Sequence, residues 1–377
     1  MKLKLLGGLI TLALVLTLTG CRNRDLENEK TVVETITSEA DSNRAPEPTV
    51  EIQESTKDAA TTPEATETPV VTETPKATET PETTQEIDQT SETIEKGTEQ
   101  KMGNITIEEL CPEEVAEKRE GIEYTKAVHE TYHSNTTGLD RGVNILLPSG
   151  YSEEKKYPVL YLLHGIFGDE YSLINDSNCR IPEISSNLFA DGLAKEMIIV
   201  LPNMFATTDP ELKPSFSAEG VAPYDNFIDD LVNDLMPYIN ENYSTLTDRE
   251  NTAIAGFSMG GRESLYIGIR RPDLFGFIGA IAPAPGLTPS KDWAMTHPGQ
   301  LKESELRFDE DTNLPYTLMI CCGSKDGTVG KFPENYHKIM EKNSVEHTWY
   351  EVPGADHDST AIRSGLNNFM RAIFQEQ

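Results

Sequence analysis

The sequence predicts an α/β domain in which helices cover both faces of a mostly parallel central sheet. Nearly continuous apolar runs at 158–163, 197–201 and 251–257 are typical of parallel strands that are buried on both faces. Between the last two runs, the segment 224–238 has apolar residues at helical spacing. Because strands and helices alternate along the chain, we expect helical connections between parallel strands.

The remaining elements continue this order. Alternating patterns at Ala127 to Ser134 and Arg141 to Leu147, separated by Asn135-Thr136-Thr137-Gly138, predict a β-hairpin. The helix at 224–238 is expected to bury Phe227, Leu231, Leu235 and Ile239. Further strands are expected at 277–281, 316–322 and 348–352, and further helices at 259–270, 331–342 and 360–374. An antiparallel hairpin that leads into a parallel sheet matches the α/β-hydrolase arrangement.

Composition divides the 377 residues into parts with different properties. Aromatic residues and periodic apolar runs begin near Ile105, so residues 105–377 are expected to form one α/β-hydrolase domain. The net charge of −31 includes an excess of acidic residues within this domain. Nucleic acid and anionic surfaces are therefore disfavoured as partners, whereas a neutral substrate such as a polysaccharide ester is compatible.

The first 20 residues have the features of a bacterial lipoprotein signal peptide. Lys2 and Lys4 precede an apolar run from Leu5 to Leu18, which is too short for a comfortable membrane span. Leu18-Thr19-Gly20-Cys21 is similar to a lipobox, whose cysteine becomes the lipidated N-terminus after cleavage. The alternative is an ordinary secretory signal with a chance cysteine. We expect an exported protein held on the extracellular face of the cell membrane by acyl chains at Cys21.

Residues 21–104 are predicted to form a disordered stalk. This segment is rich in Thr, Glu and Pro, has almost no aromatic residue, and repeats Thr-Glu-Thr-Pro at 66–69 and 72–75. Proline and like-charge repulsion keep such a chain extended, and it cannot bury a core. The alternative is an adhesive or glycosylated segment with a partner of its own.

The other cysteines do not define a disulfide framework. Cys321 and Cys322 are neighbours in a predicted strand, so their side chains should lie on opposite faces as buried hydrophobic groups. For Cys111 and Cys179, a disulfide and two free thiols are both compatible with the sequence.

Gly256-Phe257-Ser258-Met259-Gly260 has the pattern of a nucleophile elbow, in which a serine lies at a sharp turn between a strand and a helix. The strand expected at 251–257 precedes the serine, and the helix expected at 259–270 follows it. Glycines on both sides avoid clashes between a Cβ atom and the neighbouring backbone. Ser258 is therefore the predicted nucleophile, with an ordinary strand-to-helix turn as the alternative.

A serine nucleophile needs a base and an acid that orients the base. In this arrangement the chain order is serine, acid, histidine. His357 is the predicted base, because it lies in a loop directly after the last expected strand. Asp326 is the predicted acid, because it follows the strand at 316–322 in a turn flanked by glycines. Asp356 and Asp358 are reserve candidates, although residues adjacent to a histidine seldom fold back to orient its ring.

The backbone N–H groups expected to stabilise an oxyanion come from two turns. One belongs to Met259, at the start of the helix that follows the nucleophile. The other belongs to Ile166 or its neighbour, because His164-Gly165-Ile166 follows the strand at 158–163. His164 is expected to brace this loop through hydrogen bonds and not to act as a second base.

The segment from His129 to His133 matches the H-E-x-x-H pattern of zinc proteases. That pattern binds zinc only when a helix places both histidines on one face. The alternating polarity here predicts a strand, in which four residues separate the two imidazoles by about 13 Å. We therefore expect no metal, and nothing in the sequence implies an organic cofactor.

With these residues placed, the domain resembles the family 1 carbohydrate esterases, which include feruloyl and acetyl xylan esterases, and more loosely the enterochelin-esterase-like proteins. The resemblance covers most of 128–374 and rests on motifs at 147–151, 157–165, 224–227, 255–261, 322–326 and 354–357. It implies an α/β-hydrolase with Ser258, Asp326 and His357 in the roles given above. Members often have small residues after the His-Gly pair, where this chain has Ile166 and Phe167.

The leading functional hypothesis is a surface-anchored serine esterase that removes feruloyl or acetyl groups from plant polysaccharide such as xylan. The alternatives are a noncatalytic binding or adhesion protein with a hydrolase-like domain, and an esterase of a non-carbohydrate substrate such as a siderophore ester. An irregular segment at 283–315 contains Trp293 and several prolines between nucleophile and acid. We expect this segment to wall an acyl pocket that prefers an aromatic acyl group to acetyl.

The anchor prediction is tested by Cys21→Ser. This change removes the sulfur that would carry the lipid, and residues 22–104 offer no apolar surface of their own, so the protein should leave the membrane fraction for the medium. Cell fractionation and metabolic labelling with a radioactive fatty acid give the measurement. If the variant stays with the membrane, a different anchor holds the protein.

Overall fold

A computed structural model describes residues 101–125, 127–309 and 313–375. All of them belong to a compact unit that spans Thr90–Gln377. The predicted signal peptide, Cys21 and almost all of the predicted stalk lie outside the described residues. No helix within the described ranges has the length and apolar character needed to cross a bilayer.

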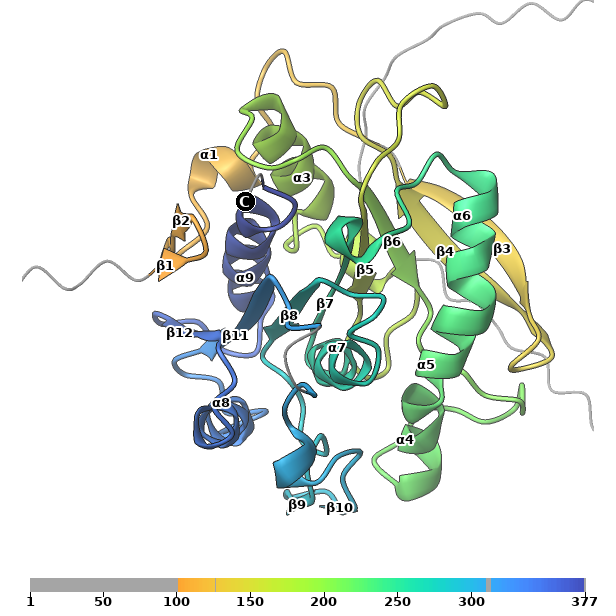
Figure 1. Cartoon of the computed structure of the whole chain (residues 1–377), viewed down its shortest axis with the longest axis vertical. Coiled ribbons are helices and arrows are strands. Elements are labelled where there is room, and N and C mark those ends of the chain that lie inside the picture. The colour runs from red at the N-terminus through yellow and green to blue at the C-terminus, as the bar shows by residue number, and fades with distance from the viewer. Residues whose placement is uncertain (1–100, 126, 310–312, 376–377) are drawn as a thin grey trace, which may run out of the picture. The chain divides into compact units, whose positions relative to one another are not determined.

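The centre of the unit is an eight-stranded sheet with the order β12-β11-β8-β7-β5-β6-β4-β3 (Figure 1). The strands are β3 Ala127–Ser134, β4 Leu139–Leu146, β5 Val159–Leu163, β6 Ile198–Pro202, β7 Thr252–Phe257, β8 Phe277–Ile281, β11 Thr317–Gly323 and β12 Thr348–Val352. All neighbours from β6 to β12 are parallel, whereas β3 and β4 form an antiparallel hairpin that joins β6. The predicted α/β-hydrolase fold, with its hairpin and parallel strands, is confirmed.

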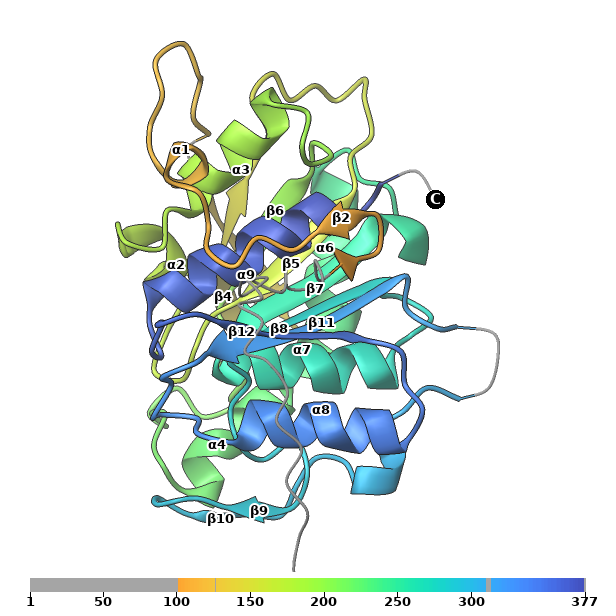
Figure 2. The same ribbon diagram turned by 90° about the vertical axis from the view of Figure 1, so that its left-hand side faces the viewer.

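Helices cover both faces of the sheet (Figures 1 and 2). One face carries α4 Ala218–Asp225, α5 Phe227–Asp230, α6 Met236–Asn242, α7 Met259–Arg270 and α8 Phe332–Lys342. The other face carries α1 Glu113–Ala116, α3 Ile181–Ala190 and α9 Ser359–Ala372. The shorter elements are β1 Lys101–Met102, β2 Ile105–Thr106, α2 Ser172–Asn175, β9 Ser290–Lys291, β10 Thr296–His297 and the 3₁₀ turns η2 Arg249–Asn251 and η3 Glu303–Glu305.

The helix predicted at 224–238 is divided in the structure. The four residues expected on its buried face, Phe227, Leu231, Leu235 and Ile239, are fully buried. However, α4 ends at Asp225, and a π-helical turn, η1 Leu231–Leu235, connects α5 to α6. Pro237 in the first turn of α6 has no N–H to donate, so the regular hydrogen-bond ladder cannot continue through this point.

The sequence did not predict the role of residues 101–125, which we call the N-terminal strap. The strap lies against α3 and α9, and the fully buried Asn187 of α3 holds it. The Asn187 amide nitrogen donates to the carbonyl oxygens of Val115 and Glu117 at 2.8 Å each. Its oxygen accepts from Arg119 Nε at 3.1 Å and from the Tyr124 hydroxyl at 2.8 Å. One side chain therefore satisfies four polar groups of the strap.

The cysteines are free thiols in the described part of the chain. Cys321 packs in the core on the α9 side, whereas Cys322 packs with Ala282 and Val329 on the other side, as alternation in a strand requires. Burial raises the pKa of Cys111 and of Cys179 to about 12, so both thiols stay protonated and unreactive near neutral pH.

A stability prediction follows from the contacts of Asn187. Asn187→Ala removes the hydrogen bonds that this side chain makes to four polar groups of the strap, among them that to the buried Val115 carbonyl, so the free energy of unfolding should fall by about 2–4 kcal/mol. Asn242→Ala is the matched control, because Asn242 is exposed and donates to a single carbonyl, that of Tyr238. Urea unfolding measures both, and equal losses would show that Asn187 does not hold the strap.

Candidate active site

Ser258 lies at the turn between β7 and α7, in a backbone conformation that only a tightly packed turn maintains. Its φ of 57° and ψ of −115° are unfavourable for a residue with a side chain, at a cost of about 1–3 kcal/mol. A Cβ on Gly256 would lie 2.4 Å from the Gly260 carbonyl carbon, and one on Gly260 would lie 2.3 Å from the Leu163 carbonyl oxygen. The turn therefore requires both glycines, for the reason that the sequence suggested.

Backbone hydrogen bonds fix the turn to the neighbouring strand. The Ser258 N–H donates to the Ile281 carbonyl at the end of β8 at 2.9 Å. The Ser258 carbonyl accepts from the N–H groups of Arg262 at 3.0 Å and Ala284 at 2.9 Å. The serine side chain is thus presented at the carboxyl edge of the sheet, where the pocket begins.

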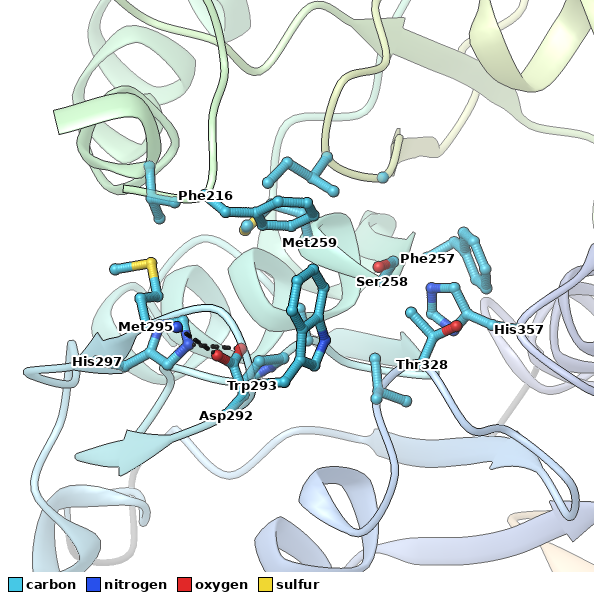
Figure 3. Close-up of a pocket in the computed structure, with 16 residues that line it drawn as sticks. Phe216, Phe257, Ser258, Met259, Asp292, Trp293, Met295, His297, Thr328 and His357 are labelled. Atoms are coloured by element: carbon cyan, nitrogen blue, oxygen red, sulfur yellow. Dashed lines mark hydrogen bonds and ion pairs between the residues drawn. The ribbon is translucent and has the colours of Figure 1, made fainter. Parts of the chain in front are cut away.

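The structure brings His357 and Asp326 together beside Ser258. His357 Nδ1 lies 2.7 Å from Asp326 Oδ2, so the imidazole donates from Nδ1 and carries its free lone pair on Nε2. Figure 3 shows this ring turned toward the Ser258 hydroxyl. The Phe257 ring lies 4.4 Å from the His357 ring and supports it from one side. The arrangement is that of a nucleophile, a base and an orienting acid.

The Asp326 carboxylate is held in place by its own turn. Oδ1 accepts from the N–H groups of Thr328 and Val329 at 3.0 Å each, which leaves Oδ2 for the imidazole. The reserve candidates have other partners: Asp356 accepts from the N–H of His357, and Asp358 caps α9. The geometry therefore favours Asp326 as the acid.

Two backbone N–H groups are available for an oxyanion. In the part of the chain that the structure describes, the N–H groups of Ile166 and Met259 have no hydrogen-bond partner. Gly165 lies against the nucleophile, since a Cβ there would be 3.5 Å from the Ser258 Cβ. The loop after β5 and the start of α7 thus flank Ser258 as predicted for an oxyanion hole.

His164 braces the loop after β5. Its Nε2 accepts from the Met204 N–H at 3.0 Å, so Nδ1 carries the proton and donates to the Gly165 carbonyl at 2.7 Å. Burial lowers the pKa of His164 to about 4, so the ring is neutral near neutral pH. Both nitrogens are occupied by backbone groups, and His164 is not available as a base.

A pocket of about 220 Å³ opens beside the nucleophile. Most of its lining is apolar, and the side chains include Ile166, Phe216, Val221, Met259, Pro285, Trp293 and Met295. Trp293 is 79% exposed, and its ring meets that of Phe216 edge-on at 5.3 Å, in front of the pocket (Figure 3). Trp293 therefore lines the pocket, as expected, although most of its side chain is exposed to solvent.

The pocket also contains polar residues that sequence reasoning missed. Asp292 and His297 lie on the opposite side of Trp293 from Ser258 (Figure 3), and their side chains are 2.9 Å apart. Asp292 also accepts from the N–H groups of Ala294 and Met295, which fixes the loop that carries Trp293. The sequence also did not indicate that Phe216 lines the pocket, because a single aromatic residue in an irregular segment after a strand has no characteristic pattern.

The H-E-x-x-H segment forms part of β3, as predicted, and its two histidines have different partners. His129 stacks on Tyr171 at 5.0 Å and faces Glu170, whereas His133 pairs with Asp140. Among the described residues, no group of three or more His, Cys, Asp or Glu side chains is arranged to hold a metal ion.

Comparisons with known proteins agree with this geometry. The family model for putative esterases matches residues 134–367. A CE1 ferulic acid esterase from Anaeromyces mucronatus, solved in complex with ferulic acid, is 47% identical with a TM-score of 0.68, over 72% of this chain and 98% of that chain. A feruloyl esterase module from Clostridium thermocellum is 18% identical with a TM-score of 0.55, over 73% and 96%, and shows the fold alone.

Among curated proteins, an endo-1,4-beta-xylanase/feruloyl esterase from Xylanibacter ruminicola is 29% identical over 248 residues. The aligned region is 64% of this chain and 30% of that protein, so this chain spans less than a third of its length. The family model and the 47% identity, which extends over nearly all of the fungal enzyme, agree on one assignment. The chain belongs to the putative esterase family and, within it, to the family 1 carbohydrate esterases that include the ferulic acid esterases.

Proposed function

We propose that this protein is a serine carboxylesterase that removes feruloyl groups from plant cell-wall xylan. The observation that carries the proposal is the alignment of Ser258, His357 and Asp326, with 2.7 Å between the last two, at the mouth of an apolar pocket. The 47% identity to a CE1 ferulic acid esterase supports the substrate class. A noncatalytic adhesion protein has no need of a strained serine beside an oriented imidazole.

In the proposed reaction, His357 Nε2 takes the proton of the Ser258 hydroxyl as Oγ attacks the ester carbonyl carbon. The resulting oxyanion accepts hydrogen bonds from the N–H groups of Ile166 and Met259. His357 then gives the proton to the departing sugar oxygen, and the acyl group remains on Ser258. Water attacks this acyl-enzyme with His357 again as the base, which releases the carboxylic acid and restores the serine.

The shape and chemistry of the pocket favour an aromatic acyl group. An acetyl group would occupy only a small part of this pocket of about 220 Å³, whose lining includes the Trp293 and Phe216 rings. A hydroxycinnamoyl group is long, flat and apolar, and its ring gains from burial against aromatic edges. Its phenolic hydroxyl would reach the polar side of the pocket, where the Asp292 carboxylate can accept a hydrogen bond.

We also propose that a lipid at Cys21 holds the esterase on the extracellular face of the cell membrane. The position of the first described residues, away from the pocket, is compatible with an anchor on the N-terminal side. Gly103 and Ile105 border a surface hollow together with Phe277 and Thr317, the first residues of β8 and β11. Ser258 and the pocket lie at the other, carboxyl edge of the sheet. The first described residues of the domain therefore border the edge of the sheet opposite the pocket.

The esterase assignment is tested by substitutions in the three catalytic residues. Ser258→Ala and His357→Ala should each lower kcat on methyl ferulate by about four to six orders of magnitude, because no acyl-enzyme can form. Asp326→Asn should lower kcat by about four orders, because it favours the wrong imidazole tautomer. Asp356→Asn and Asp358→Asn are the controls. A larger loss in either control than in Asp326→Asn would assign the acid elsewhere, and active Ser258→Ala protein would refute the mechanism.

The acyl preference is tested with two substrate classes. We expect a higher kcat/KM on methyl ferulate and feruloylated arabinoxylan than on acetylated xylan. Trp293→Ala should lower kcat/KM on the feruloyl substrates by about 5–100-fold, which corresponds to about 1–3 kcal/mol of ring burial, and should leave acetyl esters nearly unchanged. Preference for acetyl esters, with no effect of the Trp293 change, would reject the feruloyl assignment and keep the esterase.

A further inference from the structure

Tyr224 lies beneath the loop that supplies the Ile166 N–H. It is the first residue of the Tyr224-Asp225-Asn226-Phe227 segment and belongs to the last turn of α4, and its side chain is fully buried. Its hydroxyl accepts a hydrogen bond from the Phe167 N–H at 3.1 Å. Its ring packs edge-on against His164 and Phe205, at 6.4 and 5.3 Å. The hydroxyl therefore has a fixed position relative to the loop.

The loop itself needs an external anchor at this point. Phe167 has a φ of 66°, which is unfavourable for any residue except glycine. The turn closes with a 3.2 Å hydrogen bond from the Gly168 N–H to the Gly165 carbonyl. His164 donates a hydrogen bond to the Gly165 carbonyl at the start of the turn. Tyr224 accepts a hydrogen bond from the Phe167 N–H near its end. The Ile166 N–H lies between these two anchors.

Tyr224 is in turn connected to the helix that supplies the other oxyanion donor. Its neighbour Asp225 forms an ion pair with Arg262, which lies in the first turn of α7 and also pairs with the buried Glu263 at 2.6 Å. Gln300 donates to Asp225 at 3.0 Å and to Glu263 at 3.0 Å. The end of α4 is therefore fixed against the start of α7, close to the Met259 N–H.

We propose that Tyr224 is a positioning residue for the oxyanion hole. By accepting the Phe167 N–H, its hydroxyl keeps the strained turn closed and directs the Ile166 N–H toward the oxygen that becomes negative in the transition state. Tyr224 is not among the residues that line the pocket. Burial raises the pKa of Tyr224 to about 12, so the hydroxyl remains neutral throughout an ordinary assay range. The inference rests on the proposed esterase function.

The test compares Tyr224→Phe with wild type. The variant keeps the packed ring and removes one oxygen atom, so folding should be retained. We expect kcat on methyl ferulate to fall about 10–100-fold and KM to stay within about twofold of the wild-type value. This decrease in kcat does not exceed the decrease expected when an oxyanion donor is removed completely. A styrylboronic acid, whose tetrahedral adduct with Ser258 places an oxygen in the oxyanion hole, should bind more weakly by a similar factor. The product ferulate should bind as before.

Tyr350→Phe is the matched control. Tyr350 is also buried, and its hydroxyl accepts from Asn368 at 3.0 Å and donates to the Ser364 carbonyl at 3.3 Å, on the α9 side of the sheet. This variant is expected to lose stability without a change in kcat, KM or boronic acid affinity. A kcat for Tyr224→Phe within about twofold of wild type would overturn the proposal. Equal losses of boronic acid and ferulate affinity would also overturn it, since they indicate a distorted pocket.

A measurement on wild-type protein covers the case in which Tyr224→Phe does not fold. In amide hydrogen exchange followed by NMR, the Phe167 N–H should be protected without ligand, and the Ile166 N–H should become protected only when the boronic acid is bound. Rapid exchange at Phe167 in the free enzyme would refute the role of Tyr224. If the proposed esterase function itself is wrong, wild type and Ser258→Ala will have equal turnover. This result differs from the one that rejects only the role of Tyr224, in which Ser258→Ala is inactive and Tyr224→Phe is as active as wild type.

Discussion

The close contact between Gly260 and the end of β5 determines where the other parts of the site can lie. There is no room for a side chain, since a Cβ on Gly260 would be 2.3 Å from the Leu163 carbonyl oxygen and 2.7 Å from that of His164. Strands β5 and β7 are parallel neighbours, and Leu163 is paired with Gly256 in register. The loop after β5 therefore emerges beside Ser258, and one strand pairing places both halves of the proposed oxyanion hole.

The same edge of the sheet brings His357, the proposed base, to Ser258 from a distant part of the chain. Strands β11 and β12 are parallel neighbours, with Gly323 paired to Val352, so the loops that carry Asp326 and His357 emerge side by side. Only β8 separates them from β7. Loops at the carboxyl ends of parallel strands are free to vary, whereas the strands that position them are fixed by burial on both faces.

Sequence reasoning predicted the strands well, because a strand buried on both faces leaves a nearly continuous apolar run. The bounds of β3, β8 and β12 agree with the prediction at every residue. It also proposed Ser258, Asp326 and His357 as catalytic residues from chain order and glycine-rich turns, which are local signals, and the structure brings the three residues to one edge of the sheet. The N-terminal strap was missed because its contacts depend on Asn187, far away in sequence. Likewise, nothing local indicates that Phe216 and Trp293 meet in front of the pocket.

The negative charge of the protein affects the binding of the ester substrate and of the acid product differently. An ester substrate is neutral at the reacting group, and its ring is attracted to the pocket by apolar contact and not by charge. In the proposed reaction, hydrolysis produces a carboxylate anion at Ser258, in a chain with a net charge of −31. Since like charges repel, the net negative charge of the protein disfavours binding of this anion relative to the neutral ester. An acidic domain with an apolar pocket therefore favours entry of a neutral ester and departure of the acid that it releases.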